Sequence, residues 1–320
     1  MPRVSVGMPV HNGERFIRPA IESLLSQDFT DFELIISDNA STDGTQEICS
    51  EFAQRDARIR YLRTSQNLGA AANFNRVFEL ATGEFFKWAT HDDVCACSNL
   101  RRCLEVFDRS PPEVVLCYGK TVLIDEKGQV IRPYEDRMDL RQASPHRRLE
   151  HVLRYLFLCH VDMGLIRRRI LATTRLHAPY RGSDTVLVAE LALRGKFYEI
   201  PEPLFFRRLH SGNSMQAHRT AEAHALWFDP TWRGQVAVPR FQRLLGHFRA
   251  ICDAPLDWSE RLNCMRVLLR HRLIRNQEWR HLGNELHSGL RKKLKLLLAR
   301  QSQRGSRTNT AARARVDGVP

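Results

Sequence analysis

The chain has 320 residues, of which 43% are hydrophobic and 27% charged, with 17 glycines and 14 prolines. This composition excludes disorder throughout and collagen-like or low-complexity sequence, and the length is enough to bury a sizeable core. The net charge is +13, but from Arg261 onwards fifteen lysines and arginines face three acids, a balance of +12 that leaves +1 for the first 260 residues. The basicity therefore belongs to the C-terminal segment and indicates an anionic surface facing that segment.

Strand-like and helix-like patterns alternate over the first 125 residues. Apolar runs predict strands at 4–10, 32–37, 58–63 and 84–89. Helical spacing predicts helices at 16–25, through Ile48, Phe52 and Ala53, and at 70–81. Nearly continuous apolar strands between amphipathic helices are typical of an α/β protein with a mostly parallel central sheet flanked by helices.

The regular alternation ends after a strand-like run at 114–124 and a turn at 125–128. Residues 135–160 are helix-like and rich in arginine and histidine, and a short apolar run follows at 163–166. We expect a helix at 184–193, two short strands at 196–200 and 204–208 separated by a proline corner, and helices from 221 onwards. The polar, basic residues 301–320 are predicted to be disordered.

The location follows from the segments that the sequence lacks. The most hydrophobic stretch, 155–166, is interrupted by His160 and Asp162 and is too short to span a bilayer. The first residues do not resemble a secretory signal. Eight scattered cysteines without paired CxxC motifs indicate reduced thiols and disfavour zinc. We therefore expect a cytoplasmic protein.

Polar clusters follow three of the predicted strands, at residues 9–14, 38–44 and 90–93. Ligands of parallel sheets bind beyond the carboxyl ends of the strands, so we expect the clusters to meet in one crevice. The first also fits an ordinary strand-to-helix turn, and the second a helix cap. Asp92 and Asp93 repel each other unless donors or a cation lie between them. Mg²⁺ or Mn²⁺ shared with a nucleotide diphosphate fits this pair, whereas the P-loop and GxGxxG motifs are absent.

Taken in order, the motifs resemble the family 2 glycosyltransferases of the GT-A fold over about residues 3–215. The segments that carry the resemblance are Val4-Ser-Val-Gly-Met-Pro-Val-His-Asn-Gly13, Phe32-Glu-Leu-Ile-Ile-Ser-Asp38, Ser41-Thr-Asp-Gly-Thr45, Asn67-Leu-Gly69, Ala81-Thr-Gly-Glu84 and Asp92-Asp93. The resemblance implies a nucleotide-diphospho-sugar transferase fold and a nucleotide-sugar donor, with a UDP-sugar favoured.

The resemblance also implies roles for individual residues. The nucleoside pocket and the donor site would be formed by Pro9, Val10, His11, Glu14, Asp38, Asn67 and Asp92, with Asp38 bound to the base. Asp92 and Asp93 match the end of a DxD-type motif, in which one acid addresses the ribose and the last one the metal. Arg207, Arg208 and His210 resemble the segment that closes over the diphosphate, and Asp184 occupies the position of the catalytic base. A helix N-cap for Asp184 and a solvated histidine for His210 are the structural alternatives.

Three departures from the family pattern limit what is transferred. Asn39 stands where the family often has a second acid, and Thr90 or His91 where the DxD motif has its leading acid. The chain also lacks a QxxRW segment after these motifs, which disfavours a processive polymer synthase.

We therefore expect a GT-A catalytic domain at 1–215, with a nucleotide-binding half at 1–125 and an acceptor half at 126–215. A basic helical extension at 216–300 and the tail at 301–320 follow. The predicted activity is inverting, metal-dependent transfer of a sugar to a hydroxyl of a glycan or lipid-linked glycan, in surface polysaccharide or lipopolysaccharide synthesis. The alternatives are a sugar nucleotidyltransferase and a non-catalytic scaffold with a degenerate GT-A domain.

The basic C-terminal end suggests a further partner. Leucines and basic residues alternate in the segment 290–300, and apolar residues at helical spacing precede it from Trp258. Such sequences lie at the surface of anionic membranes, so residues 258–315 predict peripheral association with the inner face of the plasma membrane. A helical appendage packed on the catalytic domain is the alternative. Nucleic acid is not expected, because no nucleic-acid-binding motif accompanies the charge.

Overall fold

The structure is a computed structural model that describes residues 1–213, 217, 220–232, 237–271 and 279–285, together with positions 287, 289 and 291. The predicted disordered tail and the leucine-rich basic segment lie largely or wholly outside the described residues. Within the described part of the chain, no helix is long and apolar enough to cross a bilayer.

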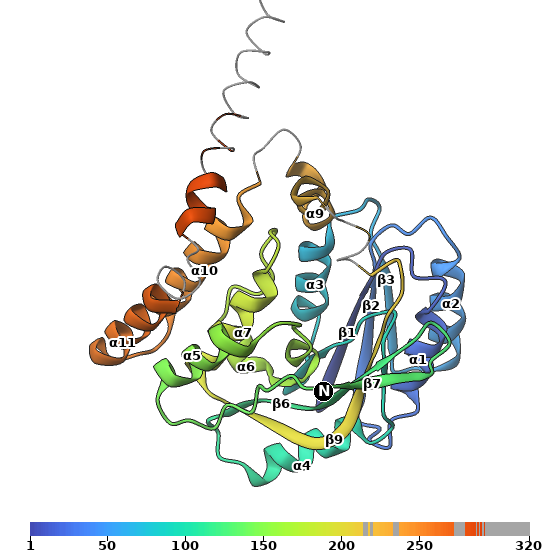
Figure 1. Cartoon of the computed structure of the whole chain (residues 1–320). Helices are drawn as coiled ribbons and strands as arrows, with labels where there is room; N and C mark the ends of the chain where they lie inside the picture. The colour runs from blue at the N-terminus through green and yellow to red at the C-terminus, as the bar shows by residue number, and fades with distance from the viewer. Residues whose placement is uncertain are drawn as a thin grey trace, which may run out of the picture.

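A nine-stranded mixed sheet forms the centre of the protein (Figure 1), with the order β3-β2-β1-β4-β8-β6-β9-β5 and with β7 paired to β6. The strands are β1 (Val4–Val10), β2 (Phe32–Asp38), β3 (Ile59–Arg63), β4 (Phe85–Trp88), β5 (Val94–Cys95), β6 (Val114–Ile124), β7 (Val130–Tyr134), β8 (Leu165–Arg167) and β9 (Lys196–Arg208). Strands β1 to β4 pair in parallel, as the sequence predicts. Their carboxyl ends therefore share one edge of the sheet.

Alternate side chains of each strand are buried on opposite faces of this sheet, so the core has two parts. On β2, Leu34 and Ile36 belong to one buried cluster and Ile35 to the other. The first cluster packs against α1 (Ile17–Leu25), α2 (Thr45–Arg55) and α4 (Asn99–Arg109). The second packs against α3 (Ala70–Glu79), α5 (Pro145–Tyr155) and α7 (Ser183–Arg194). Both faces of the sheet are covered, which explains why its strands are apolar along their whole length.

Two predictions for the second half are corrected by the structure. Residues 135–144 are not helical, because Leu140 exchanges backbone hydrogen bonds with Phe197 at the end of the sheet and only Pro145 begins α5. The two short strands expected at 196–208 are one strand, β9, which continues through the prolines while its register with β6 shifts near Gly119. Gly119 is required there, since an added Cβ would lie 2.4 Å from Leu204 Cβ.

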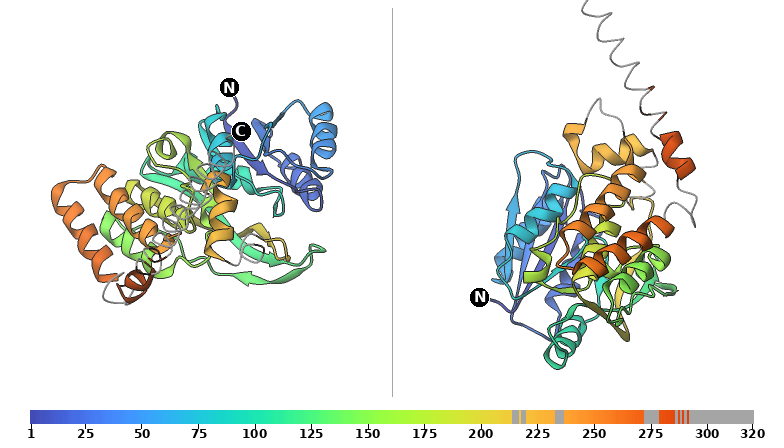
Figure 2. Two further views of the ribbon diagram at one scale, coloured as in Figure 1. Left: turned by 90° about the horizontal axis from the view of Figure 1, so that it is seen from above. Right: turned by 90° about the vertical axis from the view of Figure 1, so that its left-hand side faces the viewer.

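The described part of the C-terminal extension is helical and packs on the second half of the chain. It contains α9 (Ala221–Phe228), α10 (Pro239–Asp253) and α11 (Trp258–Leu269), with the short 3₁₀ helix η2 (Pro230–Trp232) between the first two. Helix α10 contacts α7, and α11 contacts α5. Figure 2 shows α10 and α11 as an outer layer on this side of the molecule. The short helix α6 (Arg168–Leu171) and the 3₁₀ helix η1 (Val161–Met163) connect β8 to its surroundings.

Candidate active site

The loops that follow β1 and β2 are joined by hydrogen bonds. The backbone nitrogens of Asn12 and Gly13 donate to Ser41 Oγ (2.9 Å) and Thr45 Oγ1 (2.8 Å). In return, Glu14 Oε2 accepts a hydrogen bond from the nitrogen of Gly44 (2.9 Å) at the start of α2. Two of the three predicted polar clusters therefore form one unit at the carboxyl edge of the sheet.

Asp38 lies beneath this unit and is fully buried. Its Oδ1 accepts from the nitrogen of Ser41 (2.8 Å), and its Oδ2 accepts from Tyr61 Oη (2.8 Å) and Arg63 Nε (3.2 Å). Both carboxylate oxygens are thus occupied by groups of the protein. The contacts seen for Asp38 organise the loop.

A chain of polar side chains runs from the buried Asn39 to the exposed Asn67 and His11. Asn39 Nδ2 donates to Asn67 Oδ1 (2.9 Å), and Asn67 Nδ2 lies 3.2 Å from Nε2 of the exposed His11. Asn39 Oδ1 also accepts from the nitrogen of Leu68 (2.8 Å). Asn39, which stands where the family often has a second acid, therefore links the loop after β2 to the loop that contains Asn67. Pro9 and Val10 are buried at the end of β1, directly before His11.

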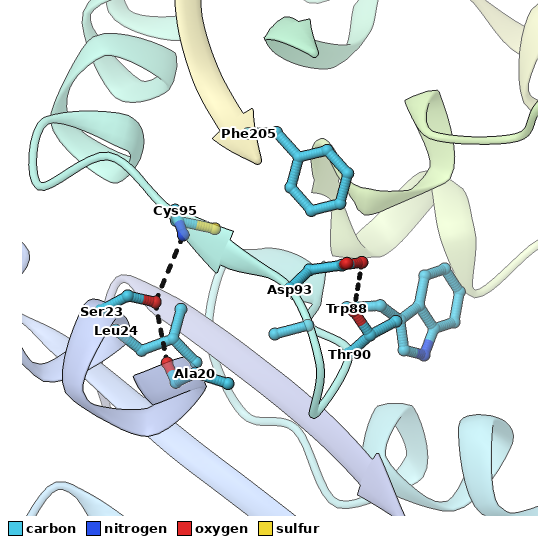
Figure 3. Close-up of a pocket in the computed structure, with 9 residues that line it drawn as sticks. Ala20, Ser23, Leu24, Trp88, Thr90, Asp93, Cys95 and Phe205 are labelled. Atoms are coloured by element: carbon cyan, nitrogen blue, oxygen red, sulfur yellow. Dashed lines mark hydrogen bonds between the residues drawn. The ribbon is translucent and has the colours of Figure 1, made fainter. Parts of the chain in front are cut away.

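Asp93 is held by three donors. Its Oδ2 accepts from Thr90 Oγ1 (2.6 Å) and Arg207 Nη1 (3.0 Å), and its Oδ1 from the nitrogen of Arg208 (2.8 Å). A small pocket beneath it is lined by mostly apolar groups, including Trp88 and Phe205 (Figure 3). Low polarity around the Arg207–Asp93 pair strengthens it, because less water screens the two charges.

Asp92 differs from Asp93 in keeping one oxygen open. Its Oδ2 accepts from His210 Nε2 (2.9 Å) and Asn213 Nδ2 (3.2 Å), whereas its Oδ1 accepts no hydrogen bond from the residues that the structure describes. Burial opposes ionisation of Asp92, but the hydrogen bond from His210 and the nearby Arg207 charge outweigh it and lower its pKa. For Asp93, burial is the largest influence and raises the pKa, while Arg207 acts in the opposite direction.

The segment 206–213, here named the closing segment, lies against the loop after β1. The rings of Phe16 and His210 are 4.6 Å apart, and the Arg208 guanidinium lies 5.1 Å from the Phe16 ring centre. Gly13 lies so close to His91 that an added Cβ would be 2.8 Å from His91 Cδ2. The loops after β1, β2 and β4 and the closing segment therefore converge.

Asp184 occupies the first turn of α7, a helix that begins directly after Gly182, whose φ is 88°. Its Oδ1 accepts a hydrogen bond from the nitrogen of Thr185 (2.8 Å). Burial raises the pKa of Asp184 against the influence of Arg243 and Arg181. Arg243 comes from α10, and its Cδ lies 3.1 Å from where a Cβ on Gly182 would be. The C-terminal extension thus lies against the N-terminal end of α7, the helix that carries the predicted base.

The structure adds a residue that the sequence motifs do not single out. Asp162, on η1, is 2% exposed, and its electrostatic neighbours include Asp184 and Arg207. Its Oδ1 has no hydrogen-bond partner among the described residues. Burial raises its pKa well above the usual range. The sequence signal was an acid within the most hydrophobic stretch of the chain.

The donors present for a divalent cation are few. Among the described residues, no three His, Cys, Asp or Glu side chains gather as a metal cluster. Mg²⁺ and Mn²⁺ need only one or two protein ligands when substrate phosphates supply the rest. The open Oδ1 of Asp92 fits that requirement, with His210 beside it. Asp93, with both oxygens occupied, fits it less well.

Comparisons with known proteins identify the family of the chain. The model of glycosyl transferase family 2 matches residues 5–174, and the chain belongs to that family. EpsJ of Bacillus subtilis (strain 168), an uncharacterized glycosyltransferase, is 28% identical over 176 residues, which cover 55% of this chain and 51% of EpsJ. The chain spans about half or less of the length of the first curated relatives it matches.

Solved structures share the fold. S. aureus TarS in complex with UDP-GlcNAc has a TM-score of 0.63 at 16% identity, covering 91% of this chain and 81% of that one. A mannosyltransferase from Pyrobaculum calidifontis, in complex with GDP-Man and Mn²⁺, has a TM-score of 0.50 at 15% identity, covering 92% and 87%. The GT-A type of fold expected from the sequence is therefore confirmed.

Proposed function

We propose that the chain is an inverting glycosyltransferase that moves a sugar from a nucleotide-diphosphate donor to a hydroxyl acceptor. The observation that carries this proposal is the convergence of Asp92, Arg207 and His210 at the edge where β1, β2 and β4 end. Family membership supports transfer of a sugar. Under this proposal, Asp38 stabilises the nucleoside pocket from below, and His11 and Asn67 face the base and ribose.

The diphosphate would lie beside Asp92, Arg207 and His210. A Mg²⁺ or Mn²⁺ ion on Asp92, with His210 next to it, would supply Lewis-acid stabilisation of the departing phosphate. Arg207 contributes a charge-assisted hydrogen bond to the same oxygens, and Asp93 orients its guanidinium. The backbone of the closing segment is fixed by Arg208, whose Nε donates to the carbonyl of Asp92 (2.9 Å).

Asp184 is the proposed catalytic base. The acceptor hydroxyl must lose a proton as its oxygen attacks the anomeric carbon, and a carboxylate within hydrogen-bond reach accepts it. Attack from the face opposite the leaving diphosphate inverts the anomeric configuration. The raised pKa of Asp184 makes it a stronger base than an exposed carboxylate.

We assign the acceptor to the glycans or lipid-linked glycans of surface polysaccharide or lipopolysaccharide synthesis, and we favour a UDP-sugar as the donor. The TarS complex with UDP-GlcNAc supports the donor class. Exposed apolar side chains on the outer layer, among them Trp258 (71% exposed) and Phe248 (48%), combine with the basic C-terminal sequence to suit an anionic membrane surface. We therefore place the protein at the inner face of the plasma membrane.

The test is release of nucleoside diphosphate by the purified chain, with Mn²⁺ or Mg²⁺, from a panel of UDP- and GDP-sugars. We expect one donor to be cleaved preferentially in the presence of an acceptor extract. Asp184→Asn should lower transfer by about 10²–10⁴-fold and retain donor binding, while Glu79→Gln on α3 is an exposed control. Nucleotide binding without turnover of any donor would favour the scaffold alternative. Release of pyrophosphate from a nucleoside triphosphate and a sugar phosphate would favour the nucleotidyltransferase.

A further inference from the structure

Asp162 is a buried carboxylate with an oxygen that the protein does not satisfy. Its residue is 2% exposed, and no described residue donates a hydrogen bond to Oδ1. An unsatisfied buried acceptor lowers stability, and such groups in a folded protein call for an explanation. The proposed function assigns no role to Asp162.

The backbone around Asp162 is fixed from both sides. The buried Lys87 of β4 donates from Nζ to the carbonyl oxygen of Met163. His160 Nδ1 lies 3.0 Å from Asp136 Oδ1, whose carboxylate also accepts from Thr121 (2.6 Å). Contacts of η1 with α7 and β4 complete the support. The position of Asp162 is therefore set by the scaffold, as expected for a preorganised recognition group.

Asp162 is near both groups that the proposed reaction uses. Its charge acts on Arg207, which pairs with Asp93 where the diphosphate would lie. Its helix η1 contacts α7, which carries Asp184, the proposed base for the acceptor hydroxyl. The sugar that is transferred must bridge these two positions, because its anomeric carbon is bonded to the diphosphate and attacked by the acceptor.

We propose that Asp162 is a donor-specificity residue whose carboxyl group hydrogen-bonds a hydroxyl of the transferred sugar. A carboxyl group without an internal partner is suited to this task, since a sugar hydroxyl both donates and accepts hydrogen bonds. A site built to bind a hydroxyl discriminates strongly against a sugar that lacks it. This inference rests on the proposed glycosyltransferase function and names the group that reads the sugar.

The test compares binding of the preferred sugar nucleotide with binding of the corresponding nucleoside diphosphate alone, by calorimetry with Mn²⁺. We expect Asp162→Ala to weaken sugar-nucleotide binding about tenfold or more while the affinity for the nucleoside diphosphate stays within about twofold. Glu190→Gln is the matched control, because Glu190 is a buried α7 acid whose Oε1 also accepts no hydrogen bond from a described residue, although Arg175 Nη1 lies 3.8 Å away. It should leave both affinities unchanged.

A deoxy-sugar series identifies the hydroxyl. One deoxy-sugar donor should be a poor substrate for the wild-type chain, because it lacks the hydroxyl that Asp162 contacts. Asp162→Ala should not lower the activity with that donor any further. If Asp162→Ala weakened binding of the sugar nucleotide and of the nucleoside diphosphate equally, Asp162 would have a structural role and the inference would be overturned. Unchanged sugar-nucleotide binding with a raised KM for the acceptor would also overturn it. Failure of the wild-type chain to bind any nucleotide would overturn the proposed function and this inference with it.

Discussion

Arg207 Nη1 lies 3.0 Å from Asp93 Oδ2, and this ion pair connects residues 114 positions apart in the sequence. It ties the end of β9 to the loop after β4. Because the nitrogen of Arg208 also donates to Asp93, the closing segment and the acidic loop are held as one unit. The two adjacent carboxylates therefore differ in their contacts. Both oxygens of Asp93 accept hydrogen bonds, whereas Asp92 Oδ1 accepts none from the described residues.

Loss of Asp93 should reduce stability. Asp93→Ala leaves the Arg207 charge, the Thr90 hydroxyl and a backbone N–H without their acceptor, and breaking a buried pair costs about 3 kcal/mol. We take the lower end of the range for buried pairs, because Arg207 is 25% exposed. Urea unfolding measures the change. The surface pair Arg3–Asp108 supplies the control, since Asp108→Asn should cost no more than about 1 kcal/mol.

Asp92→Asn should affect cation-dependent binding more than folding. The amide can still accept from His210 or Asn213, but it no longer offers an anionic oxygen to a cation. We expect the gain in nucleoside diphosphate affinity on adding Mn²⁺ to fall about tenfold or more. Calorimetric titrations with Mn²⁺ and with EDTA give this gain directly. If Asp93→Asn lost the gain and Asp92→Asn kept it, the assignment of the two acids would be reversed.

Asp184→Asn should lower kcat by about 10²–10⁴-fold with little change in donor affinity, the effect typical of a lost general base. The wild-type pH profile supplies a second readout. Burial raises the pKa of Asp184, and a base acts only when deprotonated, so the acid limb of kcat should lie above the ordinary carboxyl range. Activity should rise with pH through that limb, and the limb should be missing from the residual activity of the variant. An unchanged limb would assign it to another group.

The sequence predicted the first half of the fold well because its signals are local. Apolar runs and helical spacing place β1 to β4 and α1 to α3 within a few residues of the observed bounds. Helix α4 and the continuous β9 were missed. Long-range pairing decides β9, since ten β6 residues pair with it despite two prolines, and the turn-like signal of Pro201 and Pro203 is overridden.

The candidate site was predicted in its residue types but not in its contacts. The order of the motifs predicted that Asp92, Asp93, Arg207 and His210 lie in one site. In the structure, Asp93 pairs with Arg207 and Asp92 pairs with His210. Which acid pairs with Arg207 and which with His210 depends on how the closing segment approaches the loop after β4. No local sequence pattern encodes that approach. Asp162 was noticed only as an interruption of an apolar run, because its neighbours Asp184 and Arg207 are distant in sequence.

Asp162→Asn should stabilise the protein at neutral pH. Burial raises the folded-state pKa of Asp162 above its ordinary value of 3.8, so folding favours the protonated form. Its contribution to stability is full below the unfolded pKa and is lost as the pH rises through the folded pKa. An amide carries no charge and removes this pH dependence. Thermal unfolding of wild type and variant from pH 4 to 8 should show curves that diverge with rising pH. Parallel curves would contradict a shifted carboxyl group.

The outer layer should bind anionic vesicles. Trp258, Leu262 and Leu269 are 71%, 39% and 51% exposed on α11, and the sequence from Arg261 onwards carries +12. Electrostatic attraction is screened by salt, whereas apolar insertion is not, so co-sedimentation with phosphatidylserine-containing vesicles should weaken markedly between about 0.05 and 0.5 M salt without disappearing. The Trp258→Ala/Leu262→Ala double variant should lose the salt-resistant part. Val130→Ala alters a similarly exposed side chain on β7 and should bind as wild type. Absence of binding at low salt would remove the membrane assignment and leave the transferase proposal intact, because Trp258, Leu262 and Leu269 are exposed on α11, which packs on α5 and α10.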